Sequence, residues 1–178
     1  MRLIVSAVTA TLLALPLTAA AQDAPADPMT AAARQQFTMA KNYIVKSAEK
    51  VPEDQFGFQP TPEVRSFGAL LGHIANANYM ICSRAAGEKS PSQENLEKTK
   101  TSKADLVKAL NDAFAYCDGV FAKMTDKAGT EAIDFFGGKQ PRLSVLIFNT
   151  AHNFEHYGNL ITYMRLKGIV PPSSEGRM

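Results

Sequence analysis

The 178-residue sequence contains no tryptophan, only two cysteines and only three histidines. The cysteines, Cys82 and Cys117, are far apart and neither belongs to a C-x-x-C pair, so a dithiol redox motif is absent. There is no marked excess of charge, because 19 lysines and arginines stand against 17 aspartates and glutamates. The basic residues are scattered, which argues against a nucleic-acid partner, since binding to phosphate backbones depends on clustered basic side chains.

Long apolar runs are also rare, and the one at the N-terminus is typical of a secretory signal peptide. Arg2 supplies a positive charge, residues 3–17 are mostly apolar, and small residues follow in "LTAAAQ". The run is short and interrupted by polar residues, so a membrane anchor is the weaker interpretation. The sequence therefore predicts a signal peptide over residues 1–21 with cleavage after Ala21, and a periplasmic or secreted protein with no membrane association after cleavage.

The rest of the chain predicts one all-α domain over residues 28–178, preceded by a disordered leader over 22–27. Apolar residues recur at three- and four-residue spacing in four stretches, 28–50, 67–86, 103–124 and 141–167. N-cap residues precede three of these stretches (Asp27, Ser66 and Ser102), and Gly87 and Gly168 are placed to end two of them. With no alternating strand pattern and no internal repeat, the predicted fold is a four-helix bundle.

The connection between the second and third predicted helices is long enough to cross the bundle. Segment 88–101 can span about 45 Å when extended, more than the length of a twenty-residue helix, so the two helices can run parallel. In parallel helices Cys82 and Cys117 lie at matching depths, which they would not do in an antiparallel hairpin. We therefore expect a disulfide between them in an oxidising compartment; two buried free thiols are the alternative.

The three histidines are candidates for one metal site. His152 and His156 are four residues apart, so they share a face of the fourth helix and can point at a single ion. His73 lies in the middle of the second helix, on an inward-facing row. Three imidazoles suit zinc, nickel, copper or ferrous iron and leave coordination positions open, as catalytic sites do. The alternative is that the histidines are hydrogen-bonded core residues.

Several polar residues lie close enough in sequence to support such a site. Asn76, Asn149 and Asn159 are each one turn from a histidine, and each can also be an ordinary polar residue. Glu155 directly precedes His156, about 100° around the helix, so HNFEH is not the HExxH motif of zinc proteases. Glu155 either orients His152 or is a solvated charge.

Two stretches, "PEDQFGFQPTPEVRSFGALLGHIANAN" and "HNFEHYGNLITYMRLKGIVPPSS", resemble the DinB-like (YfiT-like) family of proposed metalloenzymes. The resemblance covers essentially the whole chain after the signal peptide. It depends on the connection from Pro52 to Pro60, on the Gly72-His73 pair and on the H-x-x-x-H-Y-G of the fourth helix. It implies a four-helix bundle with the second and third helices parallel. It also implies a divalent metal ion, zinc or nickel in the first place, held by the three histidines.

The same resemblance implies a function. Characterised members of the family use a low-molecular-weight thiol whose pKa falls when its sulfur binds the metal. We therefore expect an exported metal-dependent transferase or hydrolase that activates a thiol or water toward an unidentified small-molecule substrate. A non-catalytic metal-binding or stress-related protein is the alternative. Arg84, Arg142 and Arg165 are candidates for binding the carboxylates of a thiol cofactor. Phe135 and Phe136 form either a flap over the site or a homodimer contact.

Overall fold

The computed structural model describes residues 25–176. The predicted signal peptide, its cleavage site and most of the predicted leader lie outside the described residues. Within 25–176, no helix combines the length and apolarity that a bilayer crossing needs.

Four long helices form the bundle, as predicted, and their bounds agree with the sequence pattern to within one residue. They are α1 (Pro28–Lys50), α2 (Phe67–Ala86), α4 (Lys103–Lys123) and α6 (Arg142–Leu166). The shorter elements are η1 (Glu53–Gln55), α3 (Leu96–Thr99), α5 (Asp126–Gly129), β1 (Ala132–Phe135), β2 (Gly138–Pro141) and η2 (Pro172–Ser174). The all-α fold class is confirmed.

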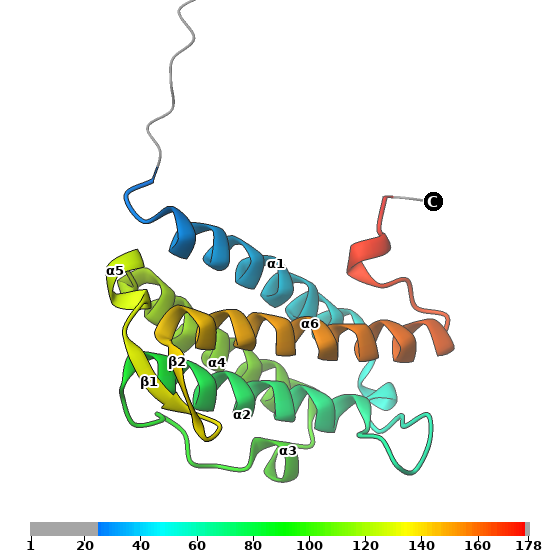
Figure 1. Cartoon of the computed structure of the whole chain (residues 1–178). Helices are drawn as coiled ribbons and strands as arrows, with labels where there is room; N and C mark the ends of the chain where they lie inside the picture. Colours follow the sequence, from blue (N-terminus) through cyan, green and yellow to red (C-terminus); the bar gives the residue numbers. More distant parts are fainter. Residues whose placement is uncertain (1–24, 177–178) are drawn as a thin grey trace, which may run out of the picture.

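Helices α2 and α4 run parallel, so the predicted crossover is also confirmed (Figure 1). Near the start of both helices, a Cβ on Gly68 would lie 3.1 Å from the side chain of Leu106. Further along both, Cys82 and Cys117 form the predicted disulfide, with their Cα atoms 5.5 Å apart and both residues buried. Segment 88–101 returns along the outside of α2 to make this direction possible (Figure 1).

Helix α6 packs antiparallel to α2 and parallel to α1. Tyr43 on α1 stacks on Tyr157 of α6, with ring centroids 5.1 Å apart. Three buried phenylalanines join α1 to α4, because Phe37 lies 5.8 Å from Phe114 and 4.8 Å from Phe121 between ring centroids. The apolar core thus fills the space that the four helices enclose.

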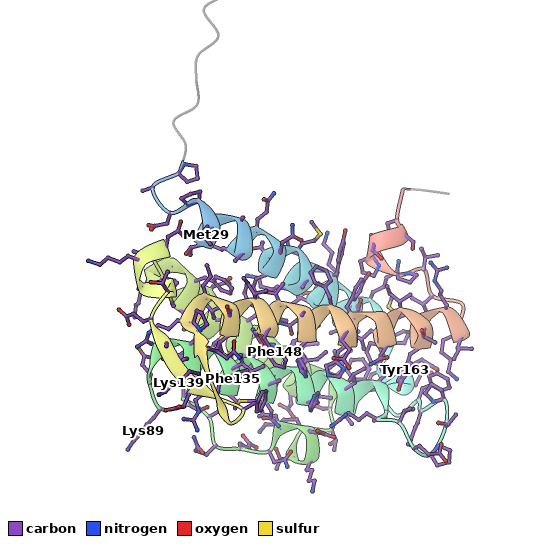
Figure 2. All side chains as sticks on the ribbon, viewed as in Figure 1. Met29, Lys89, Phe135, Lys139, Phe148 and Tyr163 are labelled. Carbon is purple, nitrogen blue, oxygen red and sulfur yellow. A yellow bond between two sulfur atoms is a disulfide. The ribbon has the colours of Figure 1, made fainter. Side chains whose placement is uncertain are left out.

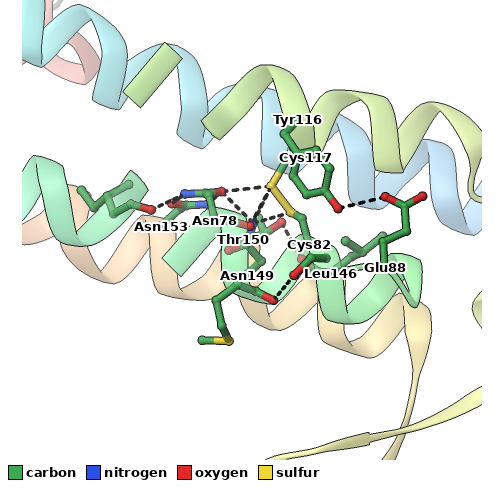
Figure 3. The surroundings of a disulfide bond; sticks show 12 residues. Asn78, Cys82, Glu88, Tyr116, Cys117, Leu146, Asn149, Thr150 and Asn153 are labelled. Carbon is green, nitrogen blue, oxygen red and sulfur yellow. Dashed lines mark hydrogen bonds between the residues drawn. A yellow bond between two sulfur atoms is a disulfide. The ribbon is translucent and has the colours of Figure 1, made fainter. Parts of the chain in front are cut away.

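A buried amide cluster lies inside the α2–α6 interface, next to the disulfide (Figure 3). Asn78 Nδ2 donates to Asn153 Oδ1 at 2.9 Å, and Asn153 Nδ2 donates back to Asn78 Oδ1 at 3.2 Å. Asn149 Nδ2 donates to the same Asn78 oxygen at 2.8 Å and lies 3.4 Å from Cys82 Sγ. All three asparagines are fully buried. Because buried amides without partners are costly, the cluster ties the two helices together at one register.

Two of the three predicted N-caps are confirmed and one is wrong. The side chain of Ser66 accepts a hydrogen bond from Ala69 N, and that of Ser102 accepts one from Asp105 N. Asp27 does not cap α1, because its carboxylate accepts instead from the backbone N–H of Asp126. The carboxylate of Asp126, delivered by α5, accepts from the first amides of α1 in its place, those of Met29 and Thr30.

Both long connections contain structure that the sequence pattern did not predict. Segment 88–101 includes α3, and the segment before α6 includes an antiparallel hairpin with Ala132 opposite Pro141 and Phe135 opposite Gly138. Its two-residue turn, Phe136-Gly137, has positive φ at both positions, +46° and +80°, as the turns that suit hairpin twist require. The expectation of no strands was wrong because a four-residue strand shows too few alternations to detect.

Removing the disulfide should destabilise the protein without changing its fold. Replacing both cysteines, Cys82→Ala with Cys117→Ala, should lower the free energy of unfolding by about 2–4 kcal/mol, because the unfolded chain regains the freedom that the cross-link removed. Urea denaturation followed by circular dichroism measures the change. A reductant should lower the midpoint of the unmodified protein and leave that of the variant unchanged. Equal midpoints for the two proteins would contradict the prediction.

Candidate metal centre

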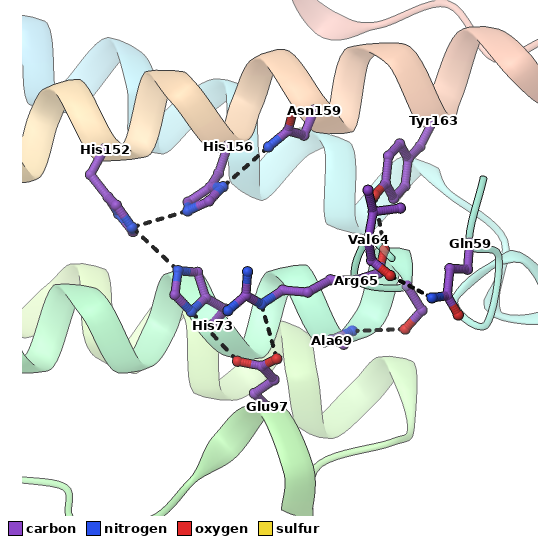
Figure 4. Close-up of polar contacts among 11 residues, drawn as sticks. Gln59, Val64, Arg65, Ala69, His73, Glu97, His152, His156, Asn159 and Tyr163 are labelled. Atoms are coloured by element: carbon purple, nitrogen blue, oxygen red, sulfur yellow. Dashed lines mark hydrogen bonds and ion pairs between the residues drawn. The ribbon is translucent and has the colours of Figure 1, made fainter. Parts of the chain in front are cut away.

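The three histidines meet between α2 and α6 (Figure 4). His152 Nε2 lies 3.3 Å from His73 Nε2 and 3.0 Å from His156 Nε2. One nitrogen from each ring lies within 4.8 Å of the others. The antiparallel packing brings them together, because it sets the first half of α2 against the middle of α6.

The donor set fits a metal ion. Two nitrogens that bind one tetrahedral zinc at 2.0–2.1 Å lie about 3.3–3.4 Å apart, close to the spacing of the Nε2 atoms here. Hydrogen bonds between the rings explain the arrangement poorly. A neutral imidazole has a single N–H, so three ring nitrogens directed at one point cannot all be paired with one another. A cation at that point can accept a lone pair from each ring.

The surroundings keep the three rings neutral. Burial lowers the pKa of His73, an effect that nearby Arg65 strengthens and Glu97 opposes. Burial also lowers the pKa of His152, with His73 adding to the shift, and it lowers that of His156 to about 3, with His152 adding to it. Neutral imidazole is the form that binds metals, so at pH 7 no proton has to leave these rings before an ion enters.

Glu97 is the neighbour that sequence reasoning missed. Its Oε2 atom lies 3.5 Å from His73 Nδ1, and its Oε1 atom accepts from Arg65 Nε at 2.9 Å (Figure 4). A carboxylate at Nδ1 holds the proton on that nitrogen and leaves Nε2 free to bind a metal, as in the carboxylate–histidine pairs of known zinc sites. Glu97 therefore orients His73 in the way that had been expected of residues on the histidines' own helices.

A close helix–helix approach places Glu97 there. A Cβ on Gly72 would lie 2.6 Å from Glu97 Cα and 2.8 Å from Glu97 N, so only glycine lets α3 come this near to α2. Leu96 is buried beneath it, and its backbone N–H donates to Asn76 Oδ1 at 3.2 Å. Asn76 thus binds the backbone of α3 and contributes to the site by holding Glu97 in place.

The other supporting candidates lie at different distances from the rings. Asn159 Nδ2 is 3.3 Å from His156 Nδ1; exchanging the amide's nitrogen and oxygen by a half-turn would let it accept the Nδ1 proton. Asn149 belongs to the buried amide cluster and contacts the disulfide sulfurs. Glu155 is exposed and lines the mouth of the cavity beside His156.

A cavity of about 730 Å³ opens beside the histidines. Its walls include His156, Asn159 and Tyr163 from α6, Arg65 from the loop before α2, and Glu97. The three arginines expected at a cofactor site are not among the residues that line it. Arg142 binds Glu131 and Ala85 O, Arg165 binds Ser174, and Arg84 lies by the hairpin. Arg65 is the cation at this cavity.

Aromatic side chains lie near the start of α6, where Figure 2 labels Phe135 and Phe148, away from Tyr163 near the end of that helix. Phe135 from the hairpin lies 5.4 Å from Phe148 of α6 between ring centroids, and Phe136 lies 5.7 Å from the same ring. Phe148 in turn is 6.5 Å from the ring of His152. Phe136 is 74% exposed. The hairpin therefore packs against α6 through Phe135, while Phe136 stays accessible.

Comparison with known proteins identifies relatives over most of the chain. The family model described as the DinB superfamily matches residues 36–160. The uncharacterized protein YjoA of Bacillus subtilis (strain 168) is 26% identical over 136 residues, which are 74% of this chain and 86% of that protein. A DinB-like protein of Bacillus cereus ATCC 10987 is similar in structure, with a TM-score of 0.70, 20% identity, and coverage of 79% of this chain and 93% of that one.

A mycothiol-dependent maleylpyruvate isomerase has the same fold. Its TM-score is 0.62 at 16% identity, and the match covers 74% of this chain and 60% of the isomerase chain. At this level of identity the likeness establishes the shared fold.

Glu97 should strengthen metal binding through His73. Glu97→Gln removes the charge but keeps the size, so the affinity for zinc should fall about tenfold or more. Competition against a chromogenic chelator measures this affinity. Glu94→Gln is the matched control, because Glu94 lies in the same crossover segment but binds Thr99 and Lys100. Equal affinities for the two variants would show that Glu97 does not act on the site.

The stability of the metal-free protein should fall as the pH drops below about 6.5. There the unfolded histidines bind protons while the folded ones stay neutral, so the unfolded state holds more protons and unfolding becomes easier. For His156, with a folded pKa of about 3, this loss extends from about 6.5 down to about 3. We compare the free energy of unfolding, measured by urea denaturation, at pH 7.5 and at pH 4.5. The difference between the two pH values should be smaller for His156→Asn than for the unmodified protein. Identical differences would contradict the lowered pKa.

Proposed function

Because the chain belongs to the DinB superfamily, we propose that it binds a divalent metal ion through His73, His152 and His156 and activates a thiol or a water molecule for a transfer or hydrolysis reaction. The observation that carries this proposal is the convergence of three Nε2 atoms from two helices on one point. Three imidazole ligands are typical of zinc and nickel sites that keep a coordination position for a further ligand.

The cavity supports a catalytic role over simple metal storage. It borders His156 and has room for a small molecule, so a substrate can approach the histidines without unfolding the bundle. When bound, a divalent ion supplies a lowered pKa to the thiol or water that it coordinates. The fold of the mycothiol-dependent isomerase makes low-molecular-weight thiols the first nucleophiles to test.

The protein's own residues prepare the site for this chemistry. Burial keeps the three rings unprotonated, Glu97 orients His73, and Asn159 stands at Nδ1 of His156. The ring of Phe148 lies stacked beside His152, with 6.5 Å between ring centroids, and adds an apolar neighbour to the site. In a transfer reaction the thiol gives up its proton to solvent water, its sulfur bonds to an electrophilic carbon, and the leaving group departs with the electron pair of the broken bond.

We further propose that this chemistry takes place outside the cytoplasm, in the periplasm or after secretion. The N-terminal sequence pattern supports export. The disulfide between Cys82 and Cys117 supports it too, because such bonds form and persist mainly in oxidising compartments.

Metal content and activity of the exported protein test the proposal together. We expect the full chain, expressed with its predicted signal peptide, to yield a mature protein that begins at Gln22 by mass spectrometry. It should carry about one divalent ion by elemental analysis. His156→Ala should lose the ion and at least about 99% of the thiol transfer to an aryl chloride, because the metal loses a ligand.

Asn111→Ala, on the exposed face of α4, is the control and should keep both metal and activity. Bound metal without turnover on thiol or ester substrates would favour the non-catalytic metal-binding alternative. If the protein holds no metal after loading with zinc and nickel, the proposal is refuted, and the histidines are hydrogen-bonded core residues.

A further inference from the structure

Arg65 lines the cavity and forms an ion pair with Glu97 there. Its Nε atom donates to Glu97 Oε1 at 2.9 Å, and its backbone oxygen accepts from Tyr163 Oη at 2.9 Å. In Figure 4 the guanidinium extends from the loop before α2 to a place beside His73, below His156. Among the described residues, its two terminal nitrogens have no hydrogen-bond partner. Four N–H donors therefore remain available in the cavity wall.

A positive group in this place is unfavourable for the site unless an anion joins it. The guanidinium lies beside His73 and shares the carboxylate of Glu97 with that ring. A divalent cation held by the three rings would be repelled by this positive charge. Glu97 offsets one positive charge, but its two oxygens already face Arg65 and His73. A site of this kind gains stability from one further negative group.

Two other carboxylates, those of Glu63 and Glu155, line the cavity and are exposed at its rim. Neither forms an ion pair with Arg65 within residues 25–176. The planar, fork-shaped guanidinium matches a carboxylate on a small molecule, which it can bind through two parallel hydrogen bonds.

We propose that the cavity binds a carboxylate-bearing small molecule, with the carboxylate on Arg65 and another group of the same molecule at the three-histidine site. This inference rests on the proposed function and names the class of its ligand. The carboxylate can belong to the thiol or to the molecule that the thiol attacks. A mercapto acid is the simplest ligand of the first kind, and a plain carboxylate tests the second.

Three thiols that differ in charge test the proposal on cobalt-loaded protein, where sulfur ligation produces an absorption band in the near ultraviolet. The probes are 3-mercaptopropionate, 2-mercaptoethanol and cysteamine, which carry a negative, a neutral and a positive group beside the thiol. Arg65→Gln should weaken mercaptopropionate about 10- to 100-fold, because a charge-assisted hydrogen-bond pair is lost. It should leave mercaptoethanol within about twofold and should not weaken cysteamine. Comparing variant with unmodified protein for each probe cancels differences in thiol acidity.

Matched variants separate charge from structure. Arg165→Gln removes the same charge from α6 away from the cavity and should weaken none of the probes, whereas Arg65→Lys should retain part of the preference for the acid. Glutarate, which has no thiol, tests the second substrate. If glutarate perturbs the cobalt spectrum of the unmodified protein but not that of Arg65→Gln, while mercaptopropionate binds equally to both, the carboxylate belongs to the molecule that the thiol attacks. Because a like charge is removed, Arg65→Gln should also bind cobalt more tightly than the unmodified protein.

The outcomes distinguish failure of the proposed metal site from failure of the inference about its ligand. If the unmodified protein binds no cobalt, the proposed function fails and this inference fails with it. If cobalt binds and Arg65→Gln weakens all three thiols equally, Arg65 only shapes the site, and the inference is overturned while the metal site stands. If cobalt binds but neither the thiols nor glutarate perturb its spectrum, the cavity does not take this class of ligand.

Discussion

Asn78 and Asn153 exchange two hydrogen bonds at the centre of the α2–α6 interface, and the arrangement of the histidines depends on that contact. Asn149 adds a third bond to the same oxygen. A slip of one turn between the helices would leave several buried amide groups without partners, at a cost of about 1–3 kcal/mol each. With this register set, His73 on the next turns of α2 faces His152 and His156. Buried asparagines that select one register are known from coiled coils, and here the register decides whether a metal site exists.

A second constraint acts on His73 from outside the bundle. Parallel α2 and α4 require a long return segment, and Gly72 lets that segment lie directly on α2. The segment carries Glu97 to the outer nitrogen of His73, while α6 presents two histidines to its inner nitrogen. The crossover is thus more than a connection, because the topology that aligns Cys82 with Cys117 also supplies the carboxylate of the site.

The sequence predicts the helices well because each has a periodic apolar face and most have local start or stop signals, such as Ser66 and Gly168. It also places His152 and His156 on one face of their helix and His73 on an inward-facing row of another, which helical periodicity alone can do. It does not reveal Glu97 or Arg65, since both lie outside the periodic segments and reach the histidines only through tertiary packing. Gly72 was the one local signal for Glu97, because a glycine inside a helix marks a close approach. The hairpin was missed because its four-residue strands show too few alternations to detect.

Burial and the positive charge of Arg65 lower the pKa of His73, nearby carboxylates oppose them, and the balance determines what the site can bind. Burial and Arg65 both disfavour protonated histidines, so the rings are ready for a metal but poorly suited to hold a positive charge alone. Glu97 compensates for only part of this and is shared between two partners. An ion would therefore bind most favourably together with an anionic ligand that reaches the free donors of Arg65. Metal affinity and ligand affinity should then be coupled, each raising the other by the same factor.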